Sequence, residues 1–230
     1  MIPGRRSQKA GPEGRGLPSL EALWREYRVA LLVGLVVVGA GAALVASSLR
    51  RPAVTTHVPT EPAPIPAGDT LIGPVTYTVD ASSPDRWRFF DFSRGSLVEA
   101  PGPLEWDLAF RRFHVVANGG EGFPGRGGIR DLGSLPFDSV TVVPEAGYQE
   151  TRAARDTVHP ATEDWFDYSF TSHILRPRDR VYAVRTAEGR YAKLEILGYY
   201  CPGARPGCLA LRYVYQGDGS RRVASAGRDR

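Results

Sequence analysis

The chain has 230 residues, 29 basic and 25 acidic side chains, and a net charge of +4. The first 28 residues hold six of the basic and three of the acidic side chains, so the rest of the chain carries only +1. This near-neutral remainder lacks the basic face that nucleic-acid binding requires, and we expect no nucleic-acid partner.

An uncharged apolar segment occupies residues 29–49. As a helix it reaches roughly 30 Å, the thickness of the apolar core of a bilayer. The basic excess in the leader, residues 1–28, favours an N-terminus in the cytoplasm and the rest of the chain outside. A cleaved signal peptide is the alternative, but the long leader favours a retained single-pass anchor in a bacterial inner membrane.

The end of the leader predicts a short amphipathic helix that begins at Ser19. Four of its residues share one face, which either lies on the membrane surface or docks against another subunit. Gly39 and Ala43 form a small-xxx-small pair that permits close contact between membrane helices. The expected membrane or partner contacts are therefore Leu20, Leu23, Trp24, Tyr27, Gly39 and Ala43.

Residues 50–69 contain five prolines and hardly any large apolar side chain. They predict an extended spacer able to reach on the order of 55 Å. The domain that follows is expected over residues 70–217. An arginine-rich tail, residues 218–230, ends the chain; it either meets an anionic surface or is frayed.

The expected domain is all-β and mainly antiparallel, because short apolar runs dominate and helix-period stretches are scarce. The clearest alternation of apolar and polar residues falls near the end of the chain. The expected strands are Val75–Val79, Trp87–Phe92, Trp106–Phe110, Phe113–Val116, Ser139–Val143, Trp165–Phe170, Arg180–Arg185, Tyr191–Leu197 and Leu209–Tyr215.

The block Trp106–Gly128 joins a Trp-Asp strand to a turn that is dense in glycine. Such a turn predicts backbone conformations that other residues avoid. Gly120–Gly125 formally matches a G-x-G-x-x-G pattern. Pro124 and the following glycines forbid the helix that a dinucleotide site needs, so we reject that interpretation.

Cys201 and Cys208 are the only cysteines, and they flank a turn-rich loop between two strand-like runs. In an oxidising compartment this arrangement predicts a disulfide that closes a hairpin. Their spacing does not fit a redox or haem-attachment motif, and no histidine lies in the loop to complete a metal site.

The domain resembles the HmuY-like family of bacterial surface haem-binding proteins. The resemblance rests on five blocks in the same order, which span residues 75–98, 106–128, 165–170, 180–200 and 209–216. It implies an all-β, largely antiparallel domain, in agreement with the strand pattern. Known members are often lipid-anchored haem carriers, whereas this chain has an apolar helix and no lipobox cysteine.

The resemblance also implies haem binding through two histidines from the region before the strand near residue 180. His159 and His173 lie in that interval, but Phe170 stands where a ligand histidine is expected. Two neutral imidazoles make a six-coordinate haem site. The alternative makes His159 a loop residue and His173 a partly buried polar group. His57 is expected to be solvated and His114 to lie on the surface.

No Walker, G-x-S-x-G or H-E-x-x-H pattern occurs, so we expect no catalysis. The acidic cluster of Glu163, Asp164 and Asp167 lacks the spacing of a calcium loop. Our main hypothesis is a non-catalytic accessory subunit, without a cofactor, whose outer domain braces a larger membrane complex such as an electron-transport or photosynthetic one. The alternative is a membrane-anchored protein that binds haem or a similar tetrapyrrole at a bis-histidine site.

Overall fold

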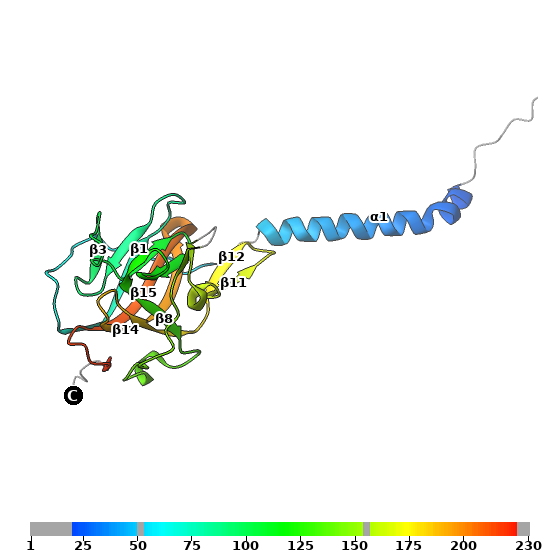
Figure 1. Cartoon of the computed structure of the whole chain (residues 1–230). Coiled ribbons are helices and arrows are strands. Elements are labelled where there is room, and N and C mark those ends of the chain that lie inside the picture. Colours follow the sequence, from blue (N-terminus) through cyan, green and yellow to red (C-terminus); the bar gives the residue numbers. More distant parts are fainter. Residues whose placement is uncertain (1–19, 50–52, 154–156, 225–230) are drawn as a thin grey trace, which may run out of the picture. The chain divides into compact units, whose positions relative to one another are not determined.

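A computed structural model describes residues 20–49, 53–153 and 157–224 of the chain. The chain divides into two compact units, Met1–Arg51 and Pro52–Arg230. Figure 1 shows the long helix α1 (Leu20–Leu49) in the first unit and a second unit built mainly from β-strands.

The described part of the first unit is the helix α1 (Leu20–Leu49). Within it, Tyr27–Ser47 is the one segment of the described chain long and apolar enough to cross a membrane. The expected lead-in helix and the expected span are continuous, because no proline or glycine cluster interrupts them. The side chains of Trp24 and Tyr27 are exposed, and those of Leu20 and Leu23 lie outside the described residues. Gly39 has open space where a side chain would be.

Two antiparallel sheets form the frame of the second unit. The larger sheet has the order β1 (Leu71–Asp80), β15 (Arg205–Gln216), β14 (Tyr191–Cys201), β13 (Val181–Arg185) and β8 (Gly128–Asp131). The smaller sheet has the order β3 (Ser96–Val98), β2 (Arg88–Asp91), β4 (Leu108–Arg111) and β5 (His114–Ala117). Every pairing between these strands is antiparallel, which confirms the predicted fold class.

In the described residues, three two-stranded ribbons and three short 3-10 helices complete the unit. The ribbons are β6 (Gly119–Gly120) with β7 (Phe123–Arg126), β9 (Arg152–Ala153) with β10 (Thr157–Val158), and β11 (Phe166–Ser169) with β12 (Ile174–Pro177). The 3-10 helices are η1 (Phe137–Ser139), η2 (Pro160–Thr162) and η3 (Pro202–Ala204).

The main hydrophobic core is made by side chains of both sheets and is rich in aromatic rings. Phe90 of β2 meets Tyr213 of β15 edge to face, with ring centroids 5.5 Å apart. Such contacts add to the hydrophobic gain from burial. The alternating side chains of β14 and β15 supply much of this core, as their sequence pattern predicts.

A second core cluster contains Phe137, Val140 and Val143. We predicted a strand over Ser139–Val143, and this prediction is wrong. Helix η1 ends at Ser139, and Val142 makes only an isolated bridge to Arg222. The buried residues recur every three positions, the period of a 3-10 turn rather than of a strand.

The segment expected as a free spacer lies along the β unit over residues 53–65, which we call the strap. Thr56 forms a bridge with Tyr200, and the His57 N–H donates to the Tyr200 carbonyl at 2.7 Å. Farther on, the Thr60 N–H donates to Thr78 of β1 at 2.9 Å. Because β1 is an edge strand, it has backbone groups free for this pairing. The described part of the predicted spacer is thus attached to the domain.

Buried polar groups explain the Trp106–Gly128 block. The Asn118 amide donates to the Trp106 carbonyl at 2.9 Å and accepts from the Gly125 N–H at 3.3 Å. A side chain at Gly119 would overlap the backbone of Gly127, and one at Gly125 would overlap that of Asn118. The glycines are therefore required by close backbone approach, and the block is a packing element of the fold.

Candidate functional site

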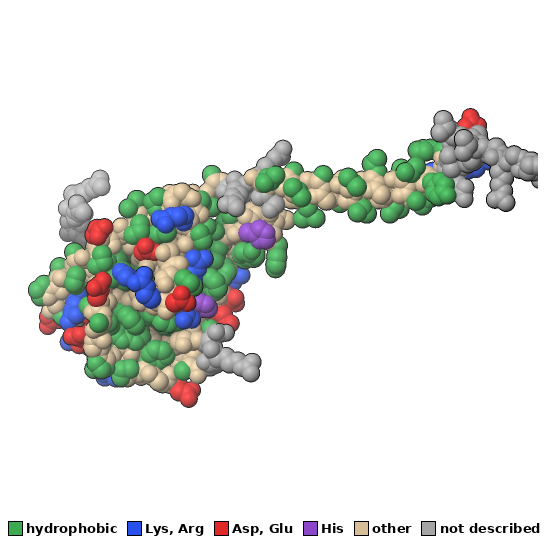
Figure 2. Space-filling view, turned by 90° about the horizontal axis from the view of Figure 1, so that it is seen from above, with side chains coloured by type: hydrophobic (Ala, Val, Ile, Leu, Met, Phe, Trp, Pro, Cys, Tyr) green, Lys and Arg blue, Asp and Glu red, His purple; other side chains and the backbone are tan. Residues whose placement is uncertain are grey.

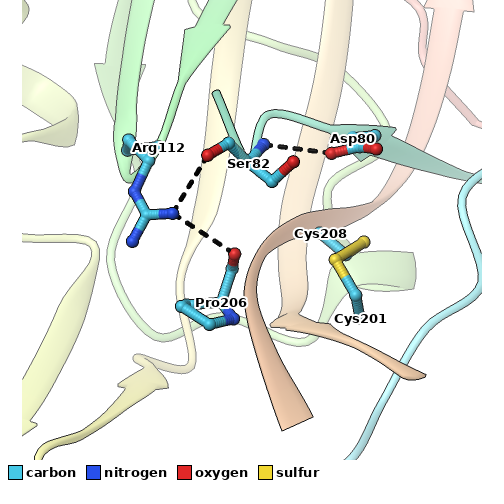
Figure 3. The surroundings of a disulfide bond; sticks show 6 residues. All are labelled: Asp80, Ser82, Arg112, Cys201, Pro206 and Cys208. Carbon is cyan, nitrogen blue, oxygen red and sulfur yellow. Dashed lines mark hydrogen bonds between the residues drawn. A yellow bond between two sulfur atoms is a disulfide. The ribbon is translucent and has the colours of Figure 1, made fainter. Parts of the chain in front are cut away.

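The disulfide joins Cys201 at the end of β14 to Cys208 in β15 and confirms the predicted pairing. Figure 3 shows it beside Asp80, whose carboxylate accepts from the Ser82 N–H at 3.0 Å. The two sulfur atoms and an Asp80 oxygen are close enough together to resemble a metal site. Because both sulfurs are engaged in the disulfide, neither is the thiolate that binds metals. The group therefore stabilises a hairpin.

His159 is buried, with only 2% of its surface exposed. Its Nδ1 accepts from the Ala161 N–H at 3.3 Å and caps η2, and its Nε2 lies 3.0 Å from the Gln149 carbonyl. Burial lowers the pKa of His159 to about 4, so the ring is neutral at pH 7. With Nδ1 as acceptor, Nε2 carries the proton and donates to Gln149. Both ring nitrogens are therefore engaged in hydrogen bonds within the protein.

His173 lies in the turn between β11 and β12, with a backbone φ of 55°. Its side chain is exposed, and its Nδ1 lies 2.7 Å from the Tyr168 hydroxyl. A ring held through Nδ1 presents Nε2 to its surroundings. A second polar group that orients an imidazole in this way is typical of histidines that bind metals.

An aromatic surface surrounds His173. Phe166, Tyr168 and Phe170 alternate along β11 and the turn, so their side chains point to the same side. Phe170 is 83% exposed and Tyr168 is 47% exposed, and their ring centroids lie 5.4 Å apart. We call Phe166, Tyr168, Phe170 and His173 the hairpin aromatic face. Figure 1 shows this hairpin projecting from the edge of the β unit.

The base of the same hairpin is anchored in the core. Trp165 is buried, and its indole N–H donates to the Phe113 carbonyl at 2.7 Å. The Leu175 N–H donates to the Tyr200 hydroxyl at 2.8 Å. Exposed rings on a rigid base are a suitable platform for a flat ligand, since little ordering is needed on binding.

Charged side chains line a cavity of the β unit outside the hairpin aromatic face. A cavity of about 360 Å³ is lined by Arg130, Asp131, Asp164 and Arg180 among others. Asp131 and Arg180 form an ion pair there, and Asp167 pairs with Arg178 at 2.9 Å. Of the acidic residues that cluster around Trp165 in the sequence, Asp164 lines this cavity and Asp167 is in an ion pair. On the face in Figure 2, basic and acidic side chains are interspersed.

The remaining two histidines belong to the frame of the domain. We expected His57 to be solvated, but its Nε2 atom is buried because the strap packs its ring against Gly198. Burial lowers the pKa of His57. His114 is half-buried, with its ring centroid 4.4 Å from that of Phe113.

The structure gives His159 and His173 different environments: one closes a buried turn and the other stands exposed on an aromatic face. Sequence reasoning named both but missed Tyr168 as the group that orients His173. Alternation of Phe166, Tyr168 and Phe170 was the available signal for the aromatic face. We interpreted Phe170 only as the replacement of a ligand.

Comparison with known proteins supports the resemblance to the HmuY family. Residues 83–169 match the model of the HmuY protein family. No curated protein sequence matches the chain. The β domain is HmuY-like, and the resemblance inferred from its five sequence blocks is confirmed.

Solved structures show the same fold. The apo HmuY analogue of Tannerella forsythia is 16% identical, with a TM-score of 0.52 over 66% of this chain and 99% of that one. Apo PinO from Porphyromonas gingivitis is 12% identical, with a TM-score of 0.50 over 64% and 98% of the two chains. At this identity the similarity establishes the architecture, and function has to be argued from the site.

Proposed function

We propose that this chain is a membrane-anchored protein that binds haem, or a similar tetrapyrrole, on the hairpin aromatic face. The observation that carries the proposal is the contact of 2.7 Å between the Tyr168 hydroxyl and Nδ1 of His173. When Nδ1 donates to the Tyr168 oxygen, Nε2 holds a lone pair, which is the form of imidazole that binds haem iron.

The side chains of the hairpin aromatic face are suited to binding a tetrapyrrole. A macrocycle is flat and apolar, and aromatic side chains such as Phe170 and Tyr168 can stack on it. His173 stands on the same hairpin. The match to the HmuY family covers β11 and ends four residues before His173, which further supports a ligand of this class.

His159 fits this role poorly in the fold described. Its Nδ1 caps η2, and its Nε2 donates to a backbone carbonyl, so iron ligation would break both hydrogen bonds. A buried group left without its partner costs about 1–3 kcal/mol. We therefore propose a single protein ligand, His173, in place of the bis-histidine site expected from the sequence.

The anchor in this proposal is α1, with the N-terminus in the cytoplasm and the β domain outside a bacterial inner membrane. The apolar segment Tyr27–Ser47 is long enough to span, and the leader before it is basic. Basic residues favour the cytoplasmic side of such a helix. No catalytic role is proposed.

Titration of the full-length chain in detergent with haemin tests the proposal. We expect saturable binding with a shifted Soret band, weakened strongly by His173→Ala and little by His159→Gln. Since both variants are compared with wild type by circular dichroism, a folding defect is separated from loss of a ligand. Equal haemin binding by wild type and His173→Ala would contradict the proposed site.

A second candidate is the accessory subunit of a larger membrane complex. It is favoured by the exposed apolar surface of the segment Tyr27–Ser47 and by the open space at Gly39. Other membrane helices could pack there. Gentle solubilisation of native membranes tests this role: co-purifying subunits support it, and a chain that migrates alone contradicts it.

A further inference from the structure

We infer that the tip of the β11–β12 hairpin, led by Phe170, contacts the interfacial layer of a lipid bilayer. The inference concerns Phe170 and Tyr168, which also belong to the hairpin aromatic face, and it applies to the protein without haem. It combines the length of chain after α1, the attachment of the strap and the chemistry of the hairpin tip.

The first step is the short connection after the apolar helix. Helix α1 ends at Leu49, and Thr56 is already bridged to Tyr200 of the β unit. Seven residues span at most about 25 Å when fully extended. If α1 crosses a membrane, the Tyr200 end of β14 therefore stays within that distance of the bilayer surface.

The second step is the position of the hairpin beside this attachment. The Tyr200 carbonyl accepts from the His57 N–H at 2.7 Å, and its hydroxyl accepts from the Leu175 N–H at 2.8 Å. Leu175 is paired with Tyr168 in the β11–β12 ribbon. One residue thus holds both the strap that leads to the helix and the hairpin that bears the exposed rings.

The third step is the chemistry of the tip. Phe170 is 83% exposed, although a phenylalanine normally gains by leaving water. Tyr168 beside it has an apolar ring and a polar hydroxyl, a combination enriched at membrane interfaces. Arg176 on β12 is exposed and can meet lipid phosphates. These groups suit the boundary between headgroups and acyl chains.

The opposite end of the large sheet provides a matched control. Tyr200 is paired with Pro206 at one end of β15, and Gln216 lies at the other end, about 33 Å away at the usual rise of a strand. Gln216 donates to the Arg222 carbonyl, and Arg222 is bridged to Val142. Val142 is 51% exposed, so a probe there is also accessible.

In the experiment, the full chain is reconstituted into lipid nanodiscs with no other membrane protein and without haem. An environment-sensitive dye is attached to Phe170→Cys or to Val142→Cys, with the native disulfide kept oxidised. We expect a blue shift and quenching by nitroxide-labelled lipid at position 170, and neither effect at position 142. Absence of quenching at 170, or equal quenching at both positions, overturns the inference. Because haem is absent, the outcome does not depend on the haem proposal.

Discussion

The carboxylate of Asp107 accepts a hydrogen bond from the backbone N–H of Ala187 at 2.8 Å, across 80 positions of sequence. Its second oxygen accepts from the Phe92 N–H at 2.9 Å. Asp107 precedes β4, and Ala187 lies in the turn after β13, so one buried side chain ties the smaller sheet to the larger one. This contact explains why an aspartate follows the tryptophan of the Trp106–Gly128 block.

The variant Asp107→Asn should destabilise the fold. An amide has one oxygen and one NH₂ group, so either the Phe92 or the Ala187 N–H would face a donor instead of an acceptor. A buried unsatisfied group costs about 1–3 kcal/mol, and we expect a lower unfolding temperature by circular dichroism. Asp85→Asn, at an exposed position, is the control. Equal melting of the two variants would show that the contact contributes nothing.

Asp107 should also make stability depend on pH. Burial, and then the nearby charge of Asp91, raise the pKa of Asp107 from 3.8 to about 7. The folded state then binds more protons than the unfolded state between these values, so this contribution is complete below pH 3.8 and is lost as pH rises through 7. Urea unfolding across this range should show the loss in wild type and a smaller loss in Asp107→Asn. Parallel curves would contradict the assignment.

His159 should make the stability of the fold depend on pH in the opposite direction to Asp107. Burial lowers the pKa of its ring from 6.5 to about 4, so the contribution of the neutral ring is present above pH 6.5 and is lost as pH falls through 4. The variant His159→Gln should be less stable at pH 7 and have a shallower acid slope. The difference between wild type and the variant in the stability lost over this window is bounded at about 3 kcal/mol. An unaltered acid slope would rule out this role.

Close packing at Gly198 should determine how firmly the strap is attached to the β unit. A side chain there would overlap the ring of His57, so Gly198→Ala should displace the ring and loosen the contact between Thr56 and Tyr200. Hydrogen exchange of the strap amides should accelerate. Gly68→Ala is the control, because the space around Gly68 accommodates a methyl group. Equal exchange in the two variants would show that the strap does not depend on this fit.

The hydroxyl of Tyr168 should strengthen haem binding without touching iron. Tyr168→Phe keeps the ring but removes the group that holds Nδ1 of His173. Loss of such an orienting contact typically weakens a metal site about 10–100-fold, and haemin titration should show a decrease of this order. In the double variant with His173→Ala the tyrosine change should have no further effect. Additive losses would mean that Tyr168 acts through stacking alone.

The sequence predicted the parts of the fold that depend on local pattern. Alternating apolar residues over Leu209–Tyr215 identify β15, and the spacing of Cys201 and Cys208 identifies the hairpin disulfide. The strands over β7 and β12 escaped notice because proline or glycine interrupts their pattern. The burial of Phe137, Val140 and Val143 follows a different period from the one we assumed.

Tertiary contacts decided what the sequence could not. His159 and His173 are both plausible ligands in a one-dimensional chain, and only the fold places one in the core and the other at an exposed tip. The strap looks like a flexible spacer by composition, yet the open edge of β1 and the gap at Gly198 accept it. Such partners are distant in sequence and leave no local signal.

The electron paramagnetic resonance spectrum of the purified ferric haem complex tests the central claim most directly. With free haemin removed, one axial histidine predicts high-spin iron in wild type and in His159→Gln, and no retained haem in His173→Ala. Two axial histidines predict low-spin iron. A low-spin spectrum that is lost in His159→Gln would contradict the proposed site, since it would require the buried ring to leave η2 and bind the metal.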